Sequence, residues 1–103
     1  MSTDKEHLNV ILESLSALED ISYRPMMGEY VLYYKDKVIG GRYDNRLLLK
    51  PTKKALELVE NPVFELPYDG AKPYLRPDLN DRELLVRIIQ TMYDELPVGR
   101  KRS

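Results

Sequence analysis

The sequence predicts an α+β domain in which an antiparallel β-meander sheet is flanked by an N-terminal, a middle and a C-terminal helix. Apolar residues recur at helical spacing near both ends of the chain. Residues 25–50, which lie between those ends, are rich in aromatic and branched side chains and are interrupted by short polar turns. The chain has 103 residues, of which 43% are hydrophobic, so it has room for one core. We therefore assign residues 1–97 to a single domain.

The first helix is predicted over residues 4–19. Thr3 and Glu6 have the spacing of a capping box, in which each side chain satisfies a backbone donor of the other residue. A stripe of apolar residues follows at intervals of three and four: Leu8, Ile11, Leu12, Leu15 and Leu18. Because the stripe is confined to one side, it must pack on another element of the domain.

The meander is predicted to contain three main strands joined by tight turns that hold Asp or Asn, residues that tolerate positive φ. The strands are residues 29–35, 38–43 and 46–50, and the turns are Asp36-Lys37 and Asp44-Asn45. Met26 and Met27 are predicted to form a short first strand, with Gly28 marking a bulge or a sharp corner.

Gly40 and Gly41 lie inside a predicted strand, where glycine costs stability. This placement predicts that another group approaches the backbone closely. A helix packed across the sheet is the commoner cause, and a ligand is the alternative.

The second half of the chain is predicted to hold two helices and an irregular region. Thr52 caps a short helix over residues 53–60. Residues 63–76 contain a turn at Tyr68-Asp69-Gly70, with a strand possible on either side and Tyr74-Leu75 placed at the sheet edge. The last helix is predicted to run from Asn80 to about residue 95, with Glu83 as its capping partner. Residues 98–103 form a basic tail that we expect to be disordered.

No catalytic constellation is recognisable, so we predict that the chain is not an enzyme. The sole histidine, His7, is predicted to be a solvated surface residue. The sequence has no cysteine and no glycine-rich phosphate loop, and we predict neither a metal nor a cofactor. A pair of acidic residues acting as general acid and base stays an open alternative, although Glu57/Glu60 and Asp81/Glu83 are typical of solvated helix residues.

Two groups of residues are candidate binding sites. Arg46 follows a tight turn, and we expect it to pair with Asp44 or with a carboxylate elsewhere in the fold. Tyr68 and Tyr74 bracket Lys72 in a loop that prolines stiffen, a pattern that could bind an anion. Solvation of Lys72 without a ligand is the simpler alternative.

Charge is uneven along the chain and suggests one kind of partner. Residues 23–54 carry eight Lys/Arg against three Asp/Glu, whereas the whole chain has a net charge of −1. The basic stretch 24–54 therefore keeps nucleic-acid binding open as an alternative function, although the overall balance argues against it as the main one.

Several motifs resemble the N-terminal domain of the TfoX (Sxy) competence-regulator family. They are residues 26–30, Leu32-Tyr33, Gly40-Gly41, residues 43–52 and residues 67–73, in order along most of the chain. The resemblance implies an α+β domain of the YgaC/TfoX-N kind, a bacterial cytoplasmic location and regulation through a transcription-regulatory protein rather than catalysis. Full regulators of the family add a C-terminal domain, and this chain stops soon after Leu96. Lys50 lies in the longest motif and joins the candidate binding residues, although the family attaches no established role to it.

From these features we expect a non-enzymatic regulatory or protein-interaction domain, with a small-ligand or anion sensor as a further alternative. The start of the chain lacks the apolar run of a secretory signal, and no stretch is long and apolar enough to span a membrane, so we expect a cytoplasmic protein. We also predict a homodimer. Tyr30 and Leu32 fall on one face of a strand and Val31 and Tyr33 on the other, so both faces of a small sheet are partly apolar.

Overall fold

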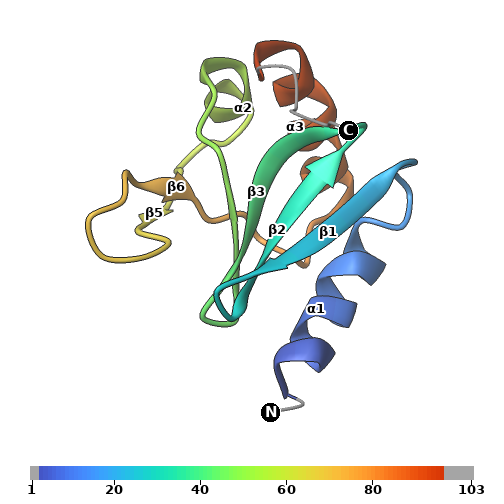
Figure 1. Cartoon of the computed structure of the whole chain (residues 1–103). Coiled ribbons are helices and arrows are strands. Elements are labelled where there is room, and N and C mark those ends of the chain that lie inside the picture. The colour runs from blue at the N-terminus through green and yellow to red at the C-terminus, as the bar shows by residue number, and fades with distance from the viewer. Residues whose placement is uncertain (1–2, 97–103) are drawn as a thin grey trace.

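A six-stranded antiparallel sheet with three α-helices makes up the fold (Figure 1). The computed structural model describes residues 3–96, with side chains from Glu6 onward. The elements are α1 (Thr3–Ser14), β1 (Ile21–Met26), β2 (Glu29–Tyr34), β3 (Lys37–Tyr43), β4 (Arg46–Leu49), α2 (Lys53–Glu57), β5 (Phe64–Glu65), β6 (Tyr74–Leu75), α3 (Arg82–Met92) and the 3₁₀ helix η1 (Tyr93–Glu95). The strand order is β1-β2-β3-β4-β6-β5. The predicted α+β class is confirmed.

Three two-residue turns connect the first four strands. All six turn residues have positive φ, as type I′ hairpin turns require. They are Met27 (53°), Gly28 (83°), Lys35 (50°), Asp36 (68°), Asp44 (52°) and Asn45 (62°). The predicted Asp44-Asn45 turn is confirmed, whereas the preceding turn is Lys35-Asp36 rather than Asp36-Lys37.

The first strand was predicted wrongly. It runs from Ile21 to Met26, and Met27 belongs to the turn after it; Gly28 lies in that turn, so the sharp corner predicted there is confirmed. Its partner β2 aligns Ile21 with Tyr34, so the strand pairs over its whole length. Pro25 is tolerated because β1 lies at the edge of the sheet, where a missing N–H breaks no ladder.

Neighbouring strands, rather than a helix or a ligand, explain Gly40 and Gly41. A Cβ on Gly40 would lie 2.1 Å from the backbone oxygen of Leu48, and one on Gly41 would lie 2.5 Å from that of Tyr30. The β2–β3 register shifts between Leu32 and Tyr33, as at a β-bulge. The expectation of a close approach is therefore right, but its predicted cause is wrong.

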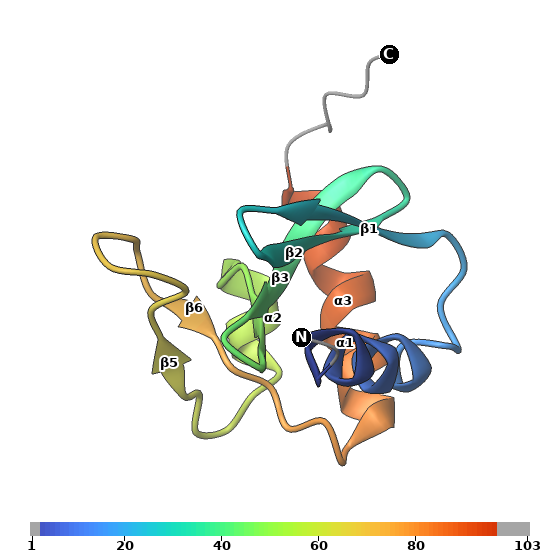
Figure 2. The ribbon, with the colours of Figure 1, turned by 60° about the horizontal axis from the view of Figure 1, so that its bottom comes forward.

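All three helices pack on one face of the sheet, and Figure 2 shows α1 and α3 together on that side of the strands. The core joins residues of α1, α2 and α3 to inward residues of the strands. Its strand members are Leu32, Tyr34, Ile39, Leu47, Leu49 and Leu75. The β5–β6 hairpin lies at one side of the molecule in the same view, and Leu75 of β6 belongs to the core. The pairing of the hairpin with β4 places Tyr74-Leu75 in the sheet, but between β4 and β5 rather than at the predicted edge, which β5 forms.

The helix limits differ from the predicted ones. α1 ends at Ser14 rather than residue 19, because bonds to the third preceding residue replace helical ones from Ser16 onward, and Asp20 at φ 60° redirects the chain. The capping-box side chain of Thr3 lies outside the described side chains. α2 begins behind Thr52 as predicted but stops at Glu57, before residue 60.

The C-terminal helix ends at Met92 rather than about residue 95, and its cap differs from the predicted one. Asp81, not Asn80, is its N-cap, because the Asp81 carboxylate accepts a hydrogen bond from the Leu84 N–H at 3.2 Å. Glu83 lies in its first turn. The predicted basic tail, residues 98–103, lies outside the described residues. Between residues 3 and 96, no helix has the length and apolar character needed to cross a bilayer.

Candidate functional site

The sequence-predicted binding residues do not converge on one site. Arg46 begins β4, Lys50 follows that strand, Tyr68 and Lys72 lie in the loop between β5 and β6, and Tyr74 is in β6. Lys72 is exposed, and among residues 3–96 its ammonium group has neither an ion-pair partner nor a cation–π contact. The predicted anion site formed by a lysine between two tyrosines is therefore not assembled by contacts in this part of the chain.

The two tyrosines instead meet around a third, Tyr43. The Tyr43 ring centroid lies 6.3 Å from that of Tyr68 and 6.4 Å from that of Tyr74, both in edge arrangements. Tyr43 is 7% exposed, and its ring lies across Gly41 on the face of the sheet that carries no helix. Burial, followed by Tyr74, Tyr68 and Glu29, raises the Tyr43 pKa to about 12. The phenol therefore stays protonated near neutrality and cannot serve there as a base.

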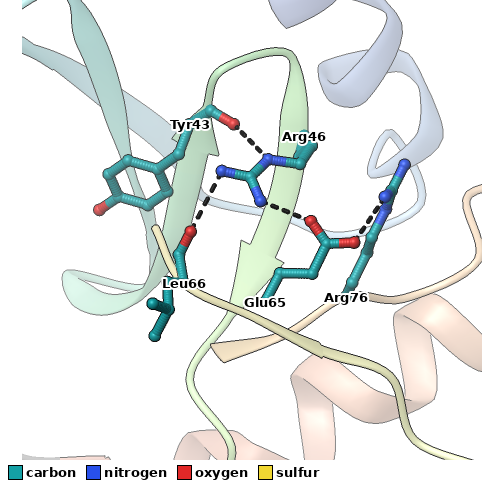
Figure 3. A network of polar contacts seen from close by, with 5 residues as sticks. All are labelled: Tyr43, Arg46, Glu65, Leu66 and Arg76. Carbon is teal, nitrogen blue, oxygen red and sulfur yellow. Dashed lines mark hydrogen bonds and ion pairs between the residues drawn. The ribbon is translucent and has the colours of Figure 1, made fainter. Parts of the chain in front are cut away.

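Arg46 pairs with a carboxylate elsewhere in the fold, one of the two predicted options. Its Nη1 donates to Glu65, its Nε donates to the Tyr43 carbonyl at 3.1 Å, and its Nη2 donates to the Leu66 carbonyl at 3.1 Å. Figure 3 shows Glu65 between two guanidinium groups, because its second oxygen accepts from Arg76 at 2.7 Å. Hydrogen bonds from Arg46 and Arg76 hold the pKa of Glu65 below its ordinary value, so this carboxylate is ionised near neutrality.

A pocket of about 290 Å³ opens beside this network. It lies where the start of α1, the turn before β4 and the chain after β6 come together. Its lining consists of His7, Asn45, Arg46, Leu47, Arg76, Pro77, Asp78 and Leu79. The pocket thus combines two guanidinium groups, an imidazole and an amide with one carboxylate.

Arg42, next to this region, is a buried charge that the sequence analysis missed. Its side chain is almost fully buried and donates to Glu29 at 3.0 Å and to the Asn45 side-chain oxygen. A signal for it exists in the sequence. Arg42 aligns with Tyr30 and Leu47 in the ladders, so strand alternation points it toward the helix-bearing face.

His7 is half-buried rather than solvated, which corrects the prediction. Its Nδ1 atom is buried and has no hydrogen-bond partner within the described residues. Burial, followed by the positive charge of Arg42, lowers the His7 pKa below its ordinary 6.5. The imidazole is therefore neutral near pH 7. Across residues 3–96, no three His, Cys, Asp or Glu side chains form a group that could hold a metal ion.

Comparison with known proteins yields one relative without an assigned activity. The chain is 40% identical over 74 residues to an uncharacterized 12.7 kDa protein in the trpE 5′ region of Spirochaeta aurantia. The match covers 72% of this chain and 64% of that protein, so it spans less than two thirds of the relative's length. No family model and no solved structure matches.

Proposed function

We propose that this chain is a non-enzymatic regulatory domain that acts by binding protein, as its resemblance to the N-terminal domain of the TfoX (Sxy) regulators implies. The motifs of residues 43–52 and 67–73 support this proposal, and so does an α+β architecture of the kind that the resemblance implies. A bacterial cytoplasmic location and a transcription-regulatory partner belong to the same proposal.

The observation that carries the proposal is a concentration of exposed apolar side chains at one end of the sheet. Val63, Phe64, Leu66 and Tyr68 are 53%, 46%, 46% and 62% exposed, respectively. They lie in and beside β5, which ends the sheet and so has one edge without a strand neighbour among the described residues. Exposed apolar surface and an open strand edge both favour protein association.

We assign the first partner of this edge to a second copy of the chain. Two-fold pairing uses the same patch on both subunits, so one exposed patch is sufficient to form both sides of the interface. The opposite edge of the sheet, β1, contains Pro25 and is less suited to strand pairing. The face of the sheet without helices exposes less apolar surface than the sequence led us to expect. Val31 and Leu48 on that face are 9% and 0% exposed within one chain, so they need no partner chain to cover them.

The size of the patch sets the expected strength of the dimer. Half-exposed apolar and aromatic side chains contribute roughly 80–100 Å² each, so the patch offers on the order of 350 Å² per chain. A standard stable interface buries about 800 Å² per partner. We therefore expect a weak dimer that forms at high micromolar concentration.

Light scattering on a matched pair of variants tests this proposal. The unchanged chain is expected to move from about 12.1 kDa toward twice that mass as its concentration rises. Val63→Arg is expected to weaken dimerisation by about tenfold, because it places a charge in the apolar patch that each subunit would bury. Val10→Arg is the control, since Val10 is 50% exposed on α1, far along the chain from β5. A chain that stays monomeric throughout, or equal effects of the two substitutions, would refute the proposal.

Nucleic-acid binding through residues 24–54 has less support. Arg42 is buried against Glu29, Arg46 is held by Glu65, and Lys37 donates to the Tyr93 carbonyl at 3.1 Å. Three of the eight cations in residues 23–54 are thus engaged within the chain. Fewer charges remain to release counterions from a phosphate backbone.

A further inference from the structure

The pocket beside Arg46 and Arg76 has the size of a small-ligand site, and none of the four exposed residues of the proposed protein-binding edge lines it. Its volume of about 290 Å³ lies at the lower end of the range of roughly 300–1,000 Å³ for small-ligand sites. Most of its lining side chains are polar or charged, and Leu47, Pro77 and Leu79 form an apolar part of the wall. A few placed polar groups beside apolar ones are typical of sites for small molecules.

The two arginines keep donors available for a ligand. A guanidinium group carries five N–H bonds. Arg46 donates through Nε, Nη1 and Nη2 once each, and Arg76 donates through Nη1 to Glu65. Within residues 3–96, the other N–H bonds of both groups have no protein acceptor. Since Arg46 is fixed at three points and shares Glu65 with Arg76, the two groups are oriented before any ligand arrives.

His7 supplies a third polar group to the lining of the pocket. Its Nδ1 is buried without a partner, and the charge of Arg42 lies close enough to disfavour a second proton on the ring. A lone pair on Nδ1 is the better arrangement beside that positive charge. The ring N–H is then on Nε2, which gives His7 a hydrogen-bond donor in the lining of the pocket.

One residue of the pocket lining carries a negative charge, which limits the charge of the ligands that the pocket accepts. Asp78 lines the pocket, and its Oδ1 accepts from the Asn80 N–H at 2.9 Å. Glu65 is already neutralised by its two arginines. Two guanidinium charges less those of Glu65 and Asp78 leave no net charge, so directed hydrogen bonds to a singly charged group are favoured over a highly charged polyanion.

We infer that this pocket binds the oxyanion group of a small molecule, a carboxylate or a phosphate, between Arg46, Arg76 and His7. Arginine recognises both groups through paired, charge-assisted hydrogen bonds. With few such bonds and an exposed Arg76, inorganic anions alone are expected to bind with a Kd on the order of 1–10 mM.

NMR titration with inorganic phosphate and with acetate, at constant ionic strength kept by chloride, tests the inference. His7 is the one histidine of the sequence, so its imidazole signals report on the pocket directly. Saturable shifts of these signals are expected with at least one of the two anions, and the tighter anion identifies the preferred group. The bound anion also raises the His7 titration midpoint, because it stabilises the imidazolium. Shifts that stay linear, or equal those from chloride, would overturn the inference.

Charge variants locate the binding. Arg76→Gln is expected to weaken anion binding by about fivefold, and Asp78→Asn to tighten it by about twofold, because they remove an attraction and a repulsion, respectively. Asn at position 78 keeps the oxygen that accepts from Asn80. The control is Arg24→Gln, which removes an exposed charge of β1 that does not line the pocket. Equal losses in Arg76→Gln and Arg24→Gln, or no gain in Asp78→Asn, would refute this location.

Discussion

Replacing Gly40 by alanine tests the tightest backbone approach in the sheet. The added Cβ would lie 2.1 Å from the Leu48 backbone oxygen and 2.8 Å from the Leu49 Cα, well inside van der Waals contact. Both atoms belong to the backbone of β4, so no side-chain rotation can relieve the clash. Gly40 also has φ 152°, a backbone conformation that residues other than glycine rarely adopt.

The two costs add to a large loss of stability. Overpacking costs about 1–3 kcal/mol, and the unfavourable φ costs about 1–3 kcal/mol more. We therefore expect Gly40→Ala to lower the free energy of unfolding by about 4 kcal/mol, out of roughly 5–15 kcal/mol for a domain of this size. Urea denaturation is the assay, and its midpoint is expected to fall by about 2 M.

Gly28→Ala separates the two costs. Gly28 has φ 83° in the first hairpin turn, but nothing lies within 4 Å of the position of its Cβ. The expected loss is about 1–2 kcal/mol, from backbone strain alone. If Gly40→Ala were no more destabilising than Gly28→Ala, the contact between β3 and β4 would not be as close as described.

Two further predictions concern single side chains. The NMR titration midpoint of His7 is expected below 6.5, and a midpoint at or above 6.5 would contradict the effect of burial and Arg42. The free energy of unfolding is expected to fall as pH falls through 6.5, because the unfolded chain takes up this proton before the folded chain does. Thr52→Ala is expected to cost about 1 kcal/mol by removing the oxygen that accepts from the Ala55 N–H. Thr52→Ser keeps that oxygen, so an equal loss of thermal stability in both variants would contradict the capping role.

The meander was largely predictable because its signals are local. Alternating apolar strands and Asp44-Asn45 identify the hairpins without knowledge of the rest of the fold. The one-residue error at Lys35-Asp36 has a tertiary cause. Lys37 belongs to β3, where its ammonium lies 4.0 Å from the Tyr93 ring centroid and donates to the Tyr93 carbonyl. A contact between residues so distant in the chain leaves no trace in the turn sequence.

The sequence predicted that Arg46 belongs to a polar site, but it did not predict which other residues form that site. Sequence spacing identified Arg46 and the need for a carboxylate partner, but Glu65 reaches it only because β5 and β6 pair beside β4. Arg76 directly follows β6, so the same strand pairing brings its guanidinium group to Glu65. His7 was assigned to the surface because the position of a helix on a sheet cannot be derived from its own periodicity.

The three two-residue turns also shape how the chain folds. Strands β1 to β4 follow one another in space in the order of the sequence, so each pairing closes a very short loop and costs little entropy. Hairpins of this kind form within about 1–10 μs. The Leu49–Leu75 pairing must instead close the segment that holds α2 and the β5–β6 hairpin. We therefore expect the meander to assemble early and the Arg46–Glu65–Arg76 network to form late, so the pocket is complete only after the last strands have docked.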